Sequence, residues 1–211
     1  MRHGKTATTG KEMPEAAPGP GLSEEGRAQA EAVGRAIAAW RPFLPVLSSV
    51  YASPLARAQE TAGLVGRCVG LTVQEEPGLV DLDVGAWAGM ALGQLPKQPG
   101  WATVAHCPSA FHFPGGEAMV TMQARVLGAV RALAGRHPGE SIIAVSHADP
   151  IKAVLADALG VHFDLFQRIV VAPASLSAVC YASEGPRVLT LNWLASPDQL
   201  PRVDGALRRR R

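Results

Sequence analysis

The sequence predicts an α/β protein, a three-layer α/β/α sandwich with a mostly parallel central sheet. Two short apolar runs, residues 46–51 and 141–146, have the length and composition of buried strands, and each is followed directly by the start of a helix. A helical stretch also precedes each run. Strands that alternate with helices in this way pair in parallel, are covered on both faces, and bind ligands at their carboxyl ends.

The first helix is predicted to begin after Ser23, an N-cap residue followed by two glutamates that favour the positive end of the helix dipole. It ends at Arg41, which precedes a proline. The strand over 46–51 then leads into a second helix, for which Ser53 is the expected N-cap and Pro54 the first helical residue.

The middle of the chain has no clear period. Prolines and glycines interrupt residues 73–116, so we expect an irregular excursion over 78–116 that covers the substrate. Regular elements resume after it, as a helix over 117–136, the strand over 141–146, a helix from Asp149-Pro150 to about 159, and a closing hairpin of 175–181 with 187–193.

Composition bounds the class of protein. A chain of 211 residues with 47% hydrophobic residues can bury one core, so we predict a single domain over 1–211. The net charge of +2 includes four arginines at 208–211, which we expect to belong to a disordered basic tail over 205–211. The remaining body carries no basic excess, which argues against nucleic-acid binding.

The cysteines and the hydropathy pattern help to predict the cellular compartment of the protein. Cys68, Cys107 and Cys180 are odd in number and far apart, which argues against a disulfide framework and against a zinc site. No apolar run approaches the roughly 18 residues of a membrane helix, and no leader precedes the body. We therefore expect a cytoplasmic protein without a membrane partner. A homo-oligomer is compatible with this sequence.

Cationic and imidazole side chains cluster at the predicted strand ends. Arg57 follows the first strand by about one helical turn, and His147 ends the apolar strand, ahead of backbone N–H groups of the next helix. Arg2 and His3 would lie at a third such strand end if a strand preceded them. Arginine is a bidentate donor to phosphate, and a neutral imidazole is a competent nucleophile at phosphorus. The pattern indicates a receptor for a phosphoryl group.

Five stretches then resemble one family. They are Arg2-His3-Gly4-Lys5-Thr6, Ser53-Pro54-Leu55-Ala56-Arg57-Ala58-Gln59-Glu60-Thr61-Ala62, Gly85-Ala86-Trp87-Ala88-Gly89, Pro114-Gly115-Gly116-Glu117 and Ser146-His147. In this order, and over nearly the whole chain, they resemble the phosphoglycerate-mutase-like branch of the histidine phosphatase superfamily. Each stretch alone is a weak signal, and the five in sequence are specific.

The resemblance implies a mechanism. His3 would be the residue that is phosphorylated, supported by Gly4, while Arg2, Arg57 and His147 hold the transferring group. No metal or other cofactor is required in such a scheme, because the arginines and His147 balance the charge on the phosphoryl oxygens. The implied activity is a metal-independent phosphomonoester hydrolase that acts on a small phosphorylated metabolite.

The proton donor implied by the family is a glutamate four residues before the first glycine of the Gly-x-Trp-x-Gly stretch, and here that position is Asp81, with Asp83 as a nearby competitor. Relatives commonly have an asparagine six residues after the nucleophile, where this chain has Thr9. Glu117 either orients the pocket histidines or only favours a helix start.

After the strand-end histidine the usual glycine is replaced by Ala148, expected to bind phosphate, and then by Asp149. Asp149 either favours a positive or hydroxyl-rich leaving group or caps the next helix. The largest departure is the apparent truncation of the first strand, which would lead into Arg2 and His3. We expect its loss to leave neighbouring backbone groups unpaired and the nucleophile poorly positioned.

Two other functions stay open. A phosphoglycerate-type phosphomutase is the alternative within the same class, although the longer insertions of mutase relatives are absent from the sequence. A catalytically weak phosphate-binding protein is the alternative from another class, favoured by Thr9, by Asp81 in place of glutamate and by the short first strand.

Overall fold

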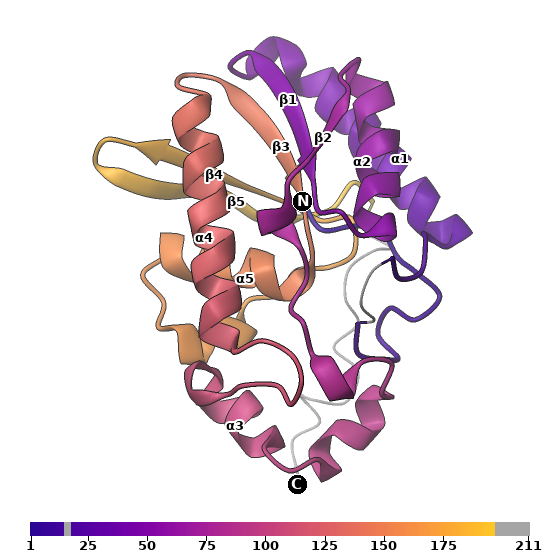
Figure 1. The fold of residues 1–211 in the computed structure, drawn as a ribbon. Coiled ribbons are helices and arrows are strands. Elements are labelled where there is room, and N and C mark those ends of the chain that lie inside the picture. The colour runs from indigo at the N-terminus through magenta and orange to yellow at the C-terminus, as the bar shows by residue number, and fades with distance from the viewer. Residues whose placement is uncertain (15–17, 197–211) are drawn as a thin grey trace, which may run out of the picture.

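The structure is a computed structural model that describes residues 1–14 and 18–196 (Figure 1). Three strands form a parallel sheet in the order β2-β1-β3, and two more form an antiparallel hairpin. The hairpin is the predicted one. The strands are β1 (Leu47–Ala52), β2 (Val73–Glu75), β3 (Ser141–Val145), β4 (Leu176–Ala182) and β5 (Gly185–Trp193).

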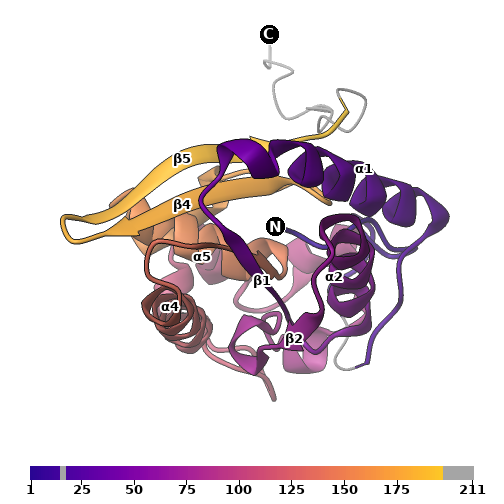
Figure 2. The same cartoon turned by 90° about the horizontal axis from the view of Figure 1, so that it is seen from above.

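Helices cover the parallel sheet on both faces, as predicted (Figure 2). The first two helices pack against each other on one face, and the last two lie together on the other. The helices are α1 (Glu24–Trp40), α2 (Ala56–Val69), α3 (Trp101–His106), α4 (Met119–Arg136) and α5 (Ala148–Ala158). In the described residues, no helix has the length and apolar character needed to cross a bilayer.

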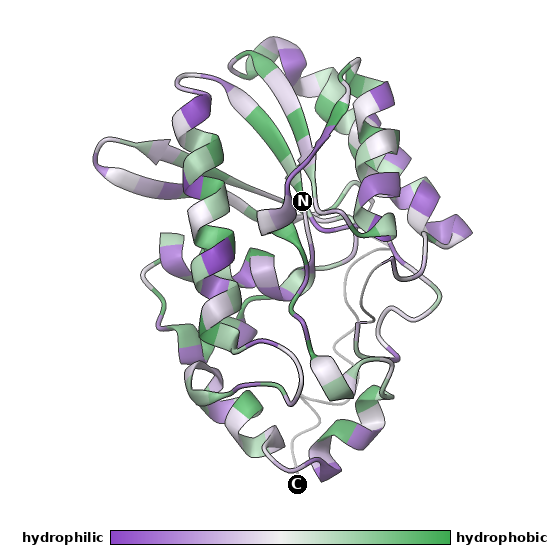
Figure 3. Cartoon of the chain, in the orientation of Figure 1, coloured by the Kyte–Doolittle hydropathy of each residue, from purple (hydrophilic) through white to green (hydrophobic). Residues whose placement is uncertain are grey.

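Each face of the sheet carries its own hydrophobic core. Ile143 and Val145 of β3 pack into the cluster that contains the buried side chains of α1 and α2. Ile142 and Ala144, which alternate with them, pack against the cluster that contains α4 and α5. This period of two is that of a strand buried on both sides, and β1 and β3 are correspondingly rich in apolar residues (Figure 3).

Residues 1–3 lie between β3 and the segment that leads into β4 (Figure 1). Their backbone bonds to Ser146 on one side and to residues 174–175 on the other, with N···O distances of 2.9–3.0 Å. Among these contacts, Arg2 and Ser146 form an isolated parallel β-bridge rather than part of a longer strand. The expectation that a short first strand leaves the neighbouring backbone unpaired is therefore wrong beside residues 1–3, and the positioning of His3 as a nucleophile stays a prediction.

Two details of the sequence prediction differ from the structure. The short strand β2 falls in the segment where no period was detected. Helix α2 begins at Ala56 with Leu55 at the cap position, so Ser53 is not its N-cap. Helix α1, in contrast, is capped by Ser23 as predicted, through a 3.1 Å bond from the backbone N–H of Gly26.

Residues 78–116 are the irregular excursion that the sequence predicts. They contain several 3₁₀ turns and the short helix α3. They form the lower end of the molecule in Figure 1. Trp87, Phe111 and Phe113 form their aromatic centre, with ring centroids 4.9–5.5 Å apart. The predicted tail over 205–211 lies outside the described residues.

Gly4 and Gly26 bring the chain after His3 against the start of α1. A Cβ built on Gly4 would lie 2.4 Å from the carbonyl oxygen of Gly26, which is backbone and cannot move aside. We expect Gly4→Ala to destabilise the protein by about 1–3 kcal/mol, the usual cost of overpacking a filled site. Chemical denaturation measures it, with Gly93→Ala as the control, because a Cβ there meets nothing within 4 Å.

Candidate active site

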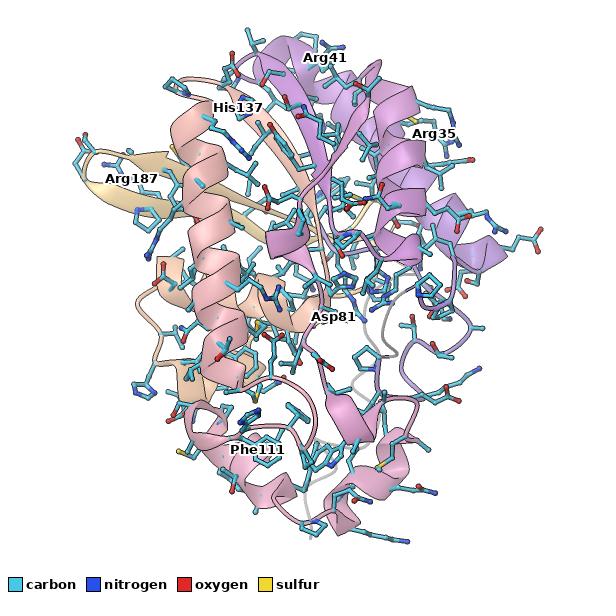
Figure 4. The ribbon with its side chains drawn as sticks, in the orientation of Figure 1. Arg35, Arg41, Asp81, Phe111, His137 and Arg187 are labelled. Atoms are coloured by element: carbon cyan, nitrogen blue, oxygen red, sulfur yellow. The ribbon has the colours of Figure 1, made fainter. Side chains whose placement is uncertain are left out.

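One cavity of about 120 Å³ lies where residues 1–3 and β3 end. Asp81, which lies between the two helical layers in Figure 4, is part of its wall. The structure brings six of the predicted site residues together in this lining, namely Arg2, His3, Thr9, Arg57, Asp81 and Ala148. His147 lies against them, fully buried. Gly4 and Glu117 are placed outside the lining.

His3 is held in one tautomer. Its Nδ1 lies 2.7 Å from the carbonyl oxygen of Gly4, which can only accept, so Nδ1 carries the proton. In the neutral ring the other nitrogen, Nε2, then has a free lone pair. The backbone of Gly4 is fixed in turn, because its N–H donates to Thr61 Oγ1 and that hydroxyl donates to the Arg57 carbonyl oxygen.

His147 stands beside His3, with ring centroids 5.1 Å apart. Its Nε2 lies 2.8 Å from Ser53 Oγ, and its buried Nδ1 has no hydrogen-bond partner. Nδ1 does lie 3.4 Å from Asp81 Oδ2, close enough for electrostatic attraction but without hydrogen-bond alignment. An Nδ1 proton facing this carboxylate is the favourable tautomer, and Nε2 then accepts from Ser53.

Arg57 and Asp81 form the principal ion pair of the site. Arg57 Nη2 lies 2.9 Å from Asp81 Oδ2, and the side chains are 4% and 14% exposed. The Leu82 N–H donates to the other carboxylate oxygen, Oδ1, at 3.0 Å. Arg57 Nη1 is buried without a partner. One oxygen of Asp81 thus lies near Arg57 and His147 at once.

Arg2 completes the cationic side of the cavity. Its Nη1 donates to the Val171 carbonyl oxygen at 2.7 Å, while its Nε is buried and unpartnered. Burial lowers the pKa of Arg2 from its ordinary value, Asp81 and Asp149 oppose this effect, and Arg57 lowers the pKa further. Unpartnered donors on Arg2, Arg57 and His147 are what an anion-binding site requires, because a buried donor without a partner is costly.

The start of α5 forms another wall. His147 occupies the N-cap position, so the first backbone N–H groups of the helix follow it at the cavity, which Ala148 and Asp149 line. Asp149 is therefore not the cap. Its carboxylate accepts from Lys152 and Gln167 at 3.2 and 3.3 Å.

Thr9 belongs to a turn of hydroxyls near His3. Its Oγ1 accepts from the Thr6 N–H at 2.9 Å and bonds to the Thr6 hydroxyl at 2.9 Å. Thr6, Thr8 and Thr9 all line the cavity. The turn gives the site short hydroxyl donors at the position where relatives were expected to have asparagine.

Glu117 contacts neither histidine in the hydrogen bonds and ion pairs of the described residues. Its Oε1 accepts from Arg125 Nη2 at 2.6 Å and from the Asp83 N–H at 3.1 Å. The same arginine of α4 donates to the carbonyl oxygens of Gly78, Val80 and Asp81 at 2.9–3.3 Å. Glu117 and Arg125 thus hold the segment that carries Asp81.

Both histidines of the site are held neutral. Burial lowers the pKa of His3 well below 6.5, and the neighbouring His147, Arg2 and Arg57 lower it further. Burial also lowers the pKa of His147 well below 6.5, with smaller contributions from Arg57, Arg2 and Arg125. A neutral His3 with a free Nε2 has the state that a nucleophile needs.

These lowered pKa values predict a pH dependence of stability. Below pH 6.5 the unfolded chain binds protons at both histidines and the native state does not. The free energy of unfolding therefore decreases as the pH is lowered. The slope is at most about 1.4 kcal/mol per pH unit for each histidine. Denaturation of the protein and of His147→Gln from pH 7 to 5 should show a shallower fall in the variant. The exposed His106, changed to glutamine, should leave the slope unaltered, and an equal slope in all three proteins would contradict the prediction.

Ser53 and Arg125 were not predicted as part of the site. Ser53 stands in a quoted motif, but its proline neighbour made it resemble a helix cap, whereas its hydroxyl bonds to His147. No sequence signal pairs Arg125 with a loop 44–47 residues earlier in the chain. His137, by contrast, lies at the far end of α4 in Figure 4, away from the cavity.

In the described part of the chain, no three His, Cys, Asp or Glu side chains lie close enough together to hold a metal ion. The three cysteines are all free.

Comparison with known proteins shows the class. The family model of the histidine phosphatase superfamily, branch 1, matches residues 1–194, and the chain belongs to this family. The chain is 30% identical over 175 residues to phosphoserine phosphatase 1 of Hydrogenobacter thermophilus, covering 82% of this chain and 81% of that protein. It is 28% identical to a probable phosphoglycerate mutase of Cronobacter sakazakii, over 93% of this chain and 86% of the relative.

Solved structures agree with the fold. A mycobacterial glucosyl-3-phosphoglycerate phosphatase, solved with VO₃, superposes with a TM-score of 0.76 at 26% identity, over 92% of this chain and 97% of that one. Some mycobacterial relatives are longer. In one of them, 30% identical to this chain, the match covers 88% of this chain but only 50% of the relative.

Proposed function

We propose that this protein is a metal-independent phosphomonoester hydrolase that forms a phosphohistidine at His3. The observation that carries the proposal is a neutral imidazole with a free Nε2, next to buried, unpartnered donors on Arg57 and His147. The donors suit the phosphoryl oxygens, and the ring suits attack at phosphorus. The substrate class is a small phosphorylated metabolite.

In the first step, the lone pair on His3 Nε2 attacks phosphorus and the bond to the leaving oxygen breaks. Asp81, in its acid form, gives its proton to that oxygen, so the product leaves as a neutral alcohol. Arg2, Arg57, His147 and the N–H groups at Ala148 stabilise the charge on the transferring group, with the Thr9 turn at the cavity wall.

In the second step, the Asp81 carboxylate takes a proton from water as that water attacks the phosphohistidine. The bond between phosphorus and Nε2 breaks, His3 regains its lone pair, and phosphate leaves. Asp81 ends protonated, ready for another turnover. The exposed Asp83 is a weaker candidate, since it lines a different cavity and its Oδ1 already accepts from the Gly85 N–H.

The position of Asp81 links anion binding to proton binding. Its Oδ2 engages Arg57 and approaches His147, the donors that a phosphoryl group also needs. An incoming anion therefore binds next to this oxygen. Two adjacent anions repel each other, so a negative charge on Asp81 opposes the binding of a phosphoryl group.

The test is hydrolysis of p-nitrophenyl phosphate in excess chelator, with rapid quenching in alkali, where phosphohistidine survives. Turnover that persists in chelator, together with a phosphorylated peptide that contains His3, would support the proposal. Phosphate binding without turnover or phosphopeptide would support a binding protein instead.

A phosphoglycerate-type mutase is the second candidate, favoured by the relative described as a probable phosphoglycerate mutase. It uses the same phosphohistidine but returns the phosphoryl group to the substrate. Product analysis on 3-phosphoglycerate separates the two functions, because a mutase yields 2-phosphoglycerate and a hydrolase yields free phosphate.

A further inference from the structure

A second and larger cavity adjoins the first. Its volume is about 350 Å³, and it shares Pro14 and Asp81 with the phosphoryl site. Asp81 must face the leaving oxygen in order to protonate it, so the rest of the leaving group has to extend from Asp81. The second cavity offers such a space, because Asp81 is one of its lining residues.

The walls of this cavity are mainly apolar. Val80, Ala88 and Pro14 line it together with Leu55, Leu82 and Val84, of which the last three are only 2–5% exposed. A cavity of this size and character favours an apolar molecule, whose burial contributes about 25 cal/mol for each Å² removed from water.

The polar part of the cavity is acidic. Asp81, Asp83 and Glu117 line it, and Arg125 is the cation among its lining residues. The two terminal nitrogens of Arg125 are already committed to Glu117 and to three backbone carbonyl oxygens. An anionic leaving group would therefore meet repulsion from carboxylates without a free cation to offset it.

We propose that this second cavity is the leaving-group subsite, and that the preferred substrate is the phosphate monoester of an apolar alcohol without an anionic group. The inference rests on the proposed function, since it takes Asp81 to be the proton donor. It separates this chain from proteins that act on phosphoserine or phosphoglycerate, whose leaving groups carry a carboxylate.

The first test compares 3-phenylpropyl phosphate with 3-phosphoglycerate and phosphoserine. All three compounds are phosphate esters of primary alcohols, so differences in the acidity of the leaving alcohol do not dominate the comparison. We expect kcat/KM to be about tenfold or more higher for the phenylpropyl ester, which is the scale that apolar pocket contacts give.

Two variants attribute that preference to the cavity. Ala88→Phe fills it from an exposed position and should lower kcat/KM for the phenylpropyl ester at least about fivefold, while Ala102→Phe on α3, also exposed and outside the lining, should not. Asp83→Asn removes one charge and keeps an acceptor for Gly85, so it should raise relative kcat/KM for 3-phosphoglycerate about threefold to tenfold. Glu184→Gln, on the hairpin between β4 and β5, is the matched charge control.

The outcomes separate this inference from the proposed function. Equal or better kcat/KM for the carboxylated esters, or ratios that Ala88→Phe and Asp83→Asn leave unchanged, would overturn the subsite while hydrolysis itself stands. Absence of turnover on every ester, including p-nitrophenyl phosphate, would overturn the proposed function and the inference that depends on it.

Discussion

His3→Gln is expected to lower kcat/KM for p-nitrophenyl phosphate by at least about 10³-fold, because the amide cannot form the covalent intermediate. Glutamine approximates the size of the ring, so the backbone pairing of residues 1–3 with Ser146 and 174–175 should persist. The measurement is steady-state turnover combined with alkaline quenching, which should give no phosphopeptide at this position.

His106→Gln is the matched control for His3→Gln. His106 is an exposed residue at the end of α3, outside the cavity, so its replacement should leave turnover within about twofold. Comparable activity of His3→Gln and the unchanged protein would contradict the phosphohistidine route, because the unprotonated nitrogen of the other buried histidine, Nε2 of His147, already accepts from Ser53.

Asp81→Asn is expected to lower kcat/KM for alkyl phosphate esters by about 10²–10⁴-fold, the range that general acid catalysis contributes. For p-nitrophenyl phosphate the loss in kcat/KM, which reports the first step and not the hydrolysis of the phosphohistidine, should be much smaller, because nitrophenolate leaves without a proton. Steady-state rates on the two ester types therefore distinguish a proton donor from a residue that only holds the fold.

Binding of tungstate supplies a second measurement on the same variant. The amide oxygen of asparagine can still accept from Arg57, but it no longer competes as an anion for the donors of the site. Calorimetry in buffers of different ionisation enthalpy should show proton uptake on tungstate binding to the unchanged protein and none with Asp81→Asn. Equal kinetic losses on both ester types, with unchanged proton uptake, would remove Asp81 from the proposed role.

Much of the site could be predicted because its residues stand beside turns and strand ends. His147 follows an apolar strand, and Arg57 follows the next strand in the sheet, so a parallel sheet necessarily brings them to one edge. His3 reaches the same edge because residues 1–3 pair with Ser146. Chain order and strand period were sufficient to predict this for Arg57 and His147, whereas the prediction for His3 rested on the family resemblance.

Other features could not be predicted, since they depend on contacts between distant segments. Ser53 has a local pattern that favours a helix cap, and only the packing of α2 against β3 shows that its hydroxyl bonds to His147 instead. Glu117 resembles an acid at the start of a helix, but its partner Arg125 lies two turns further along α4. Propensity describes neighbours in sequence, and these bonds join neighbours in space.

Because of Arg125, we expect activity and fold to be lost at two different temperatures. Its guanidinium ties the segment with Asp81 to α4 through single hydrogen bonds to three carbonyl oxygens and through one carboxylate. Leu79 and Leu82 of this segment are buried in the core beside α4, whereas the core on the opposite face of the sheet contains no residue of it. Release of the bonds to Arg125 would free the polar part of the segment, with the proposed proton donor Asp81, before either core is lost. On warming, catalysis should therefore fail while the sheet and its helices are still intact.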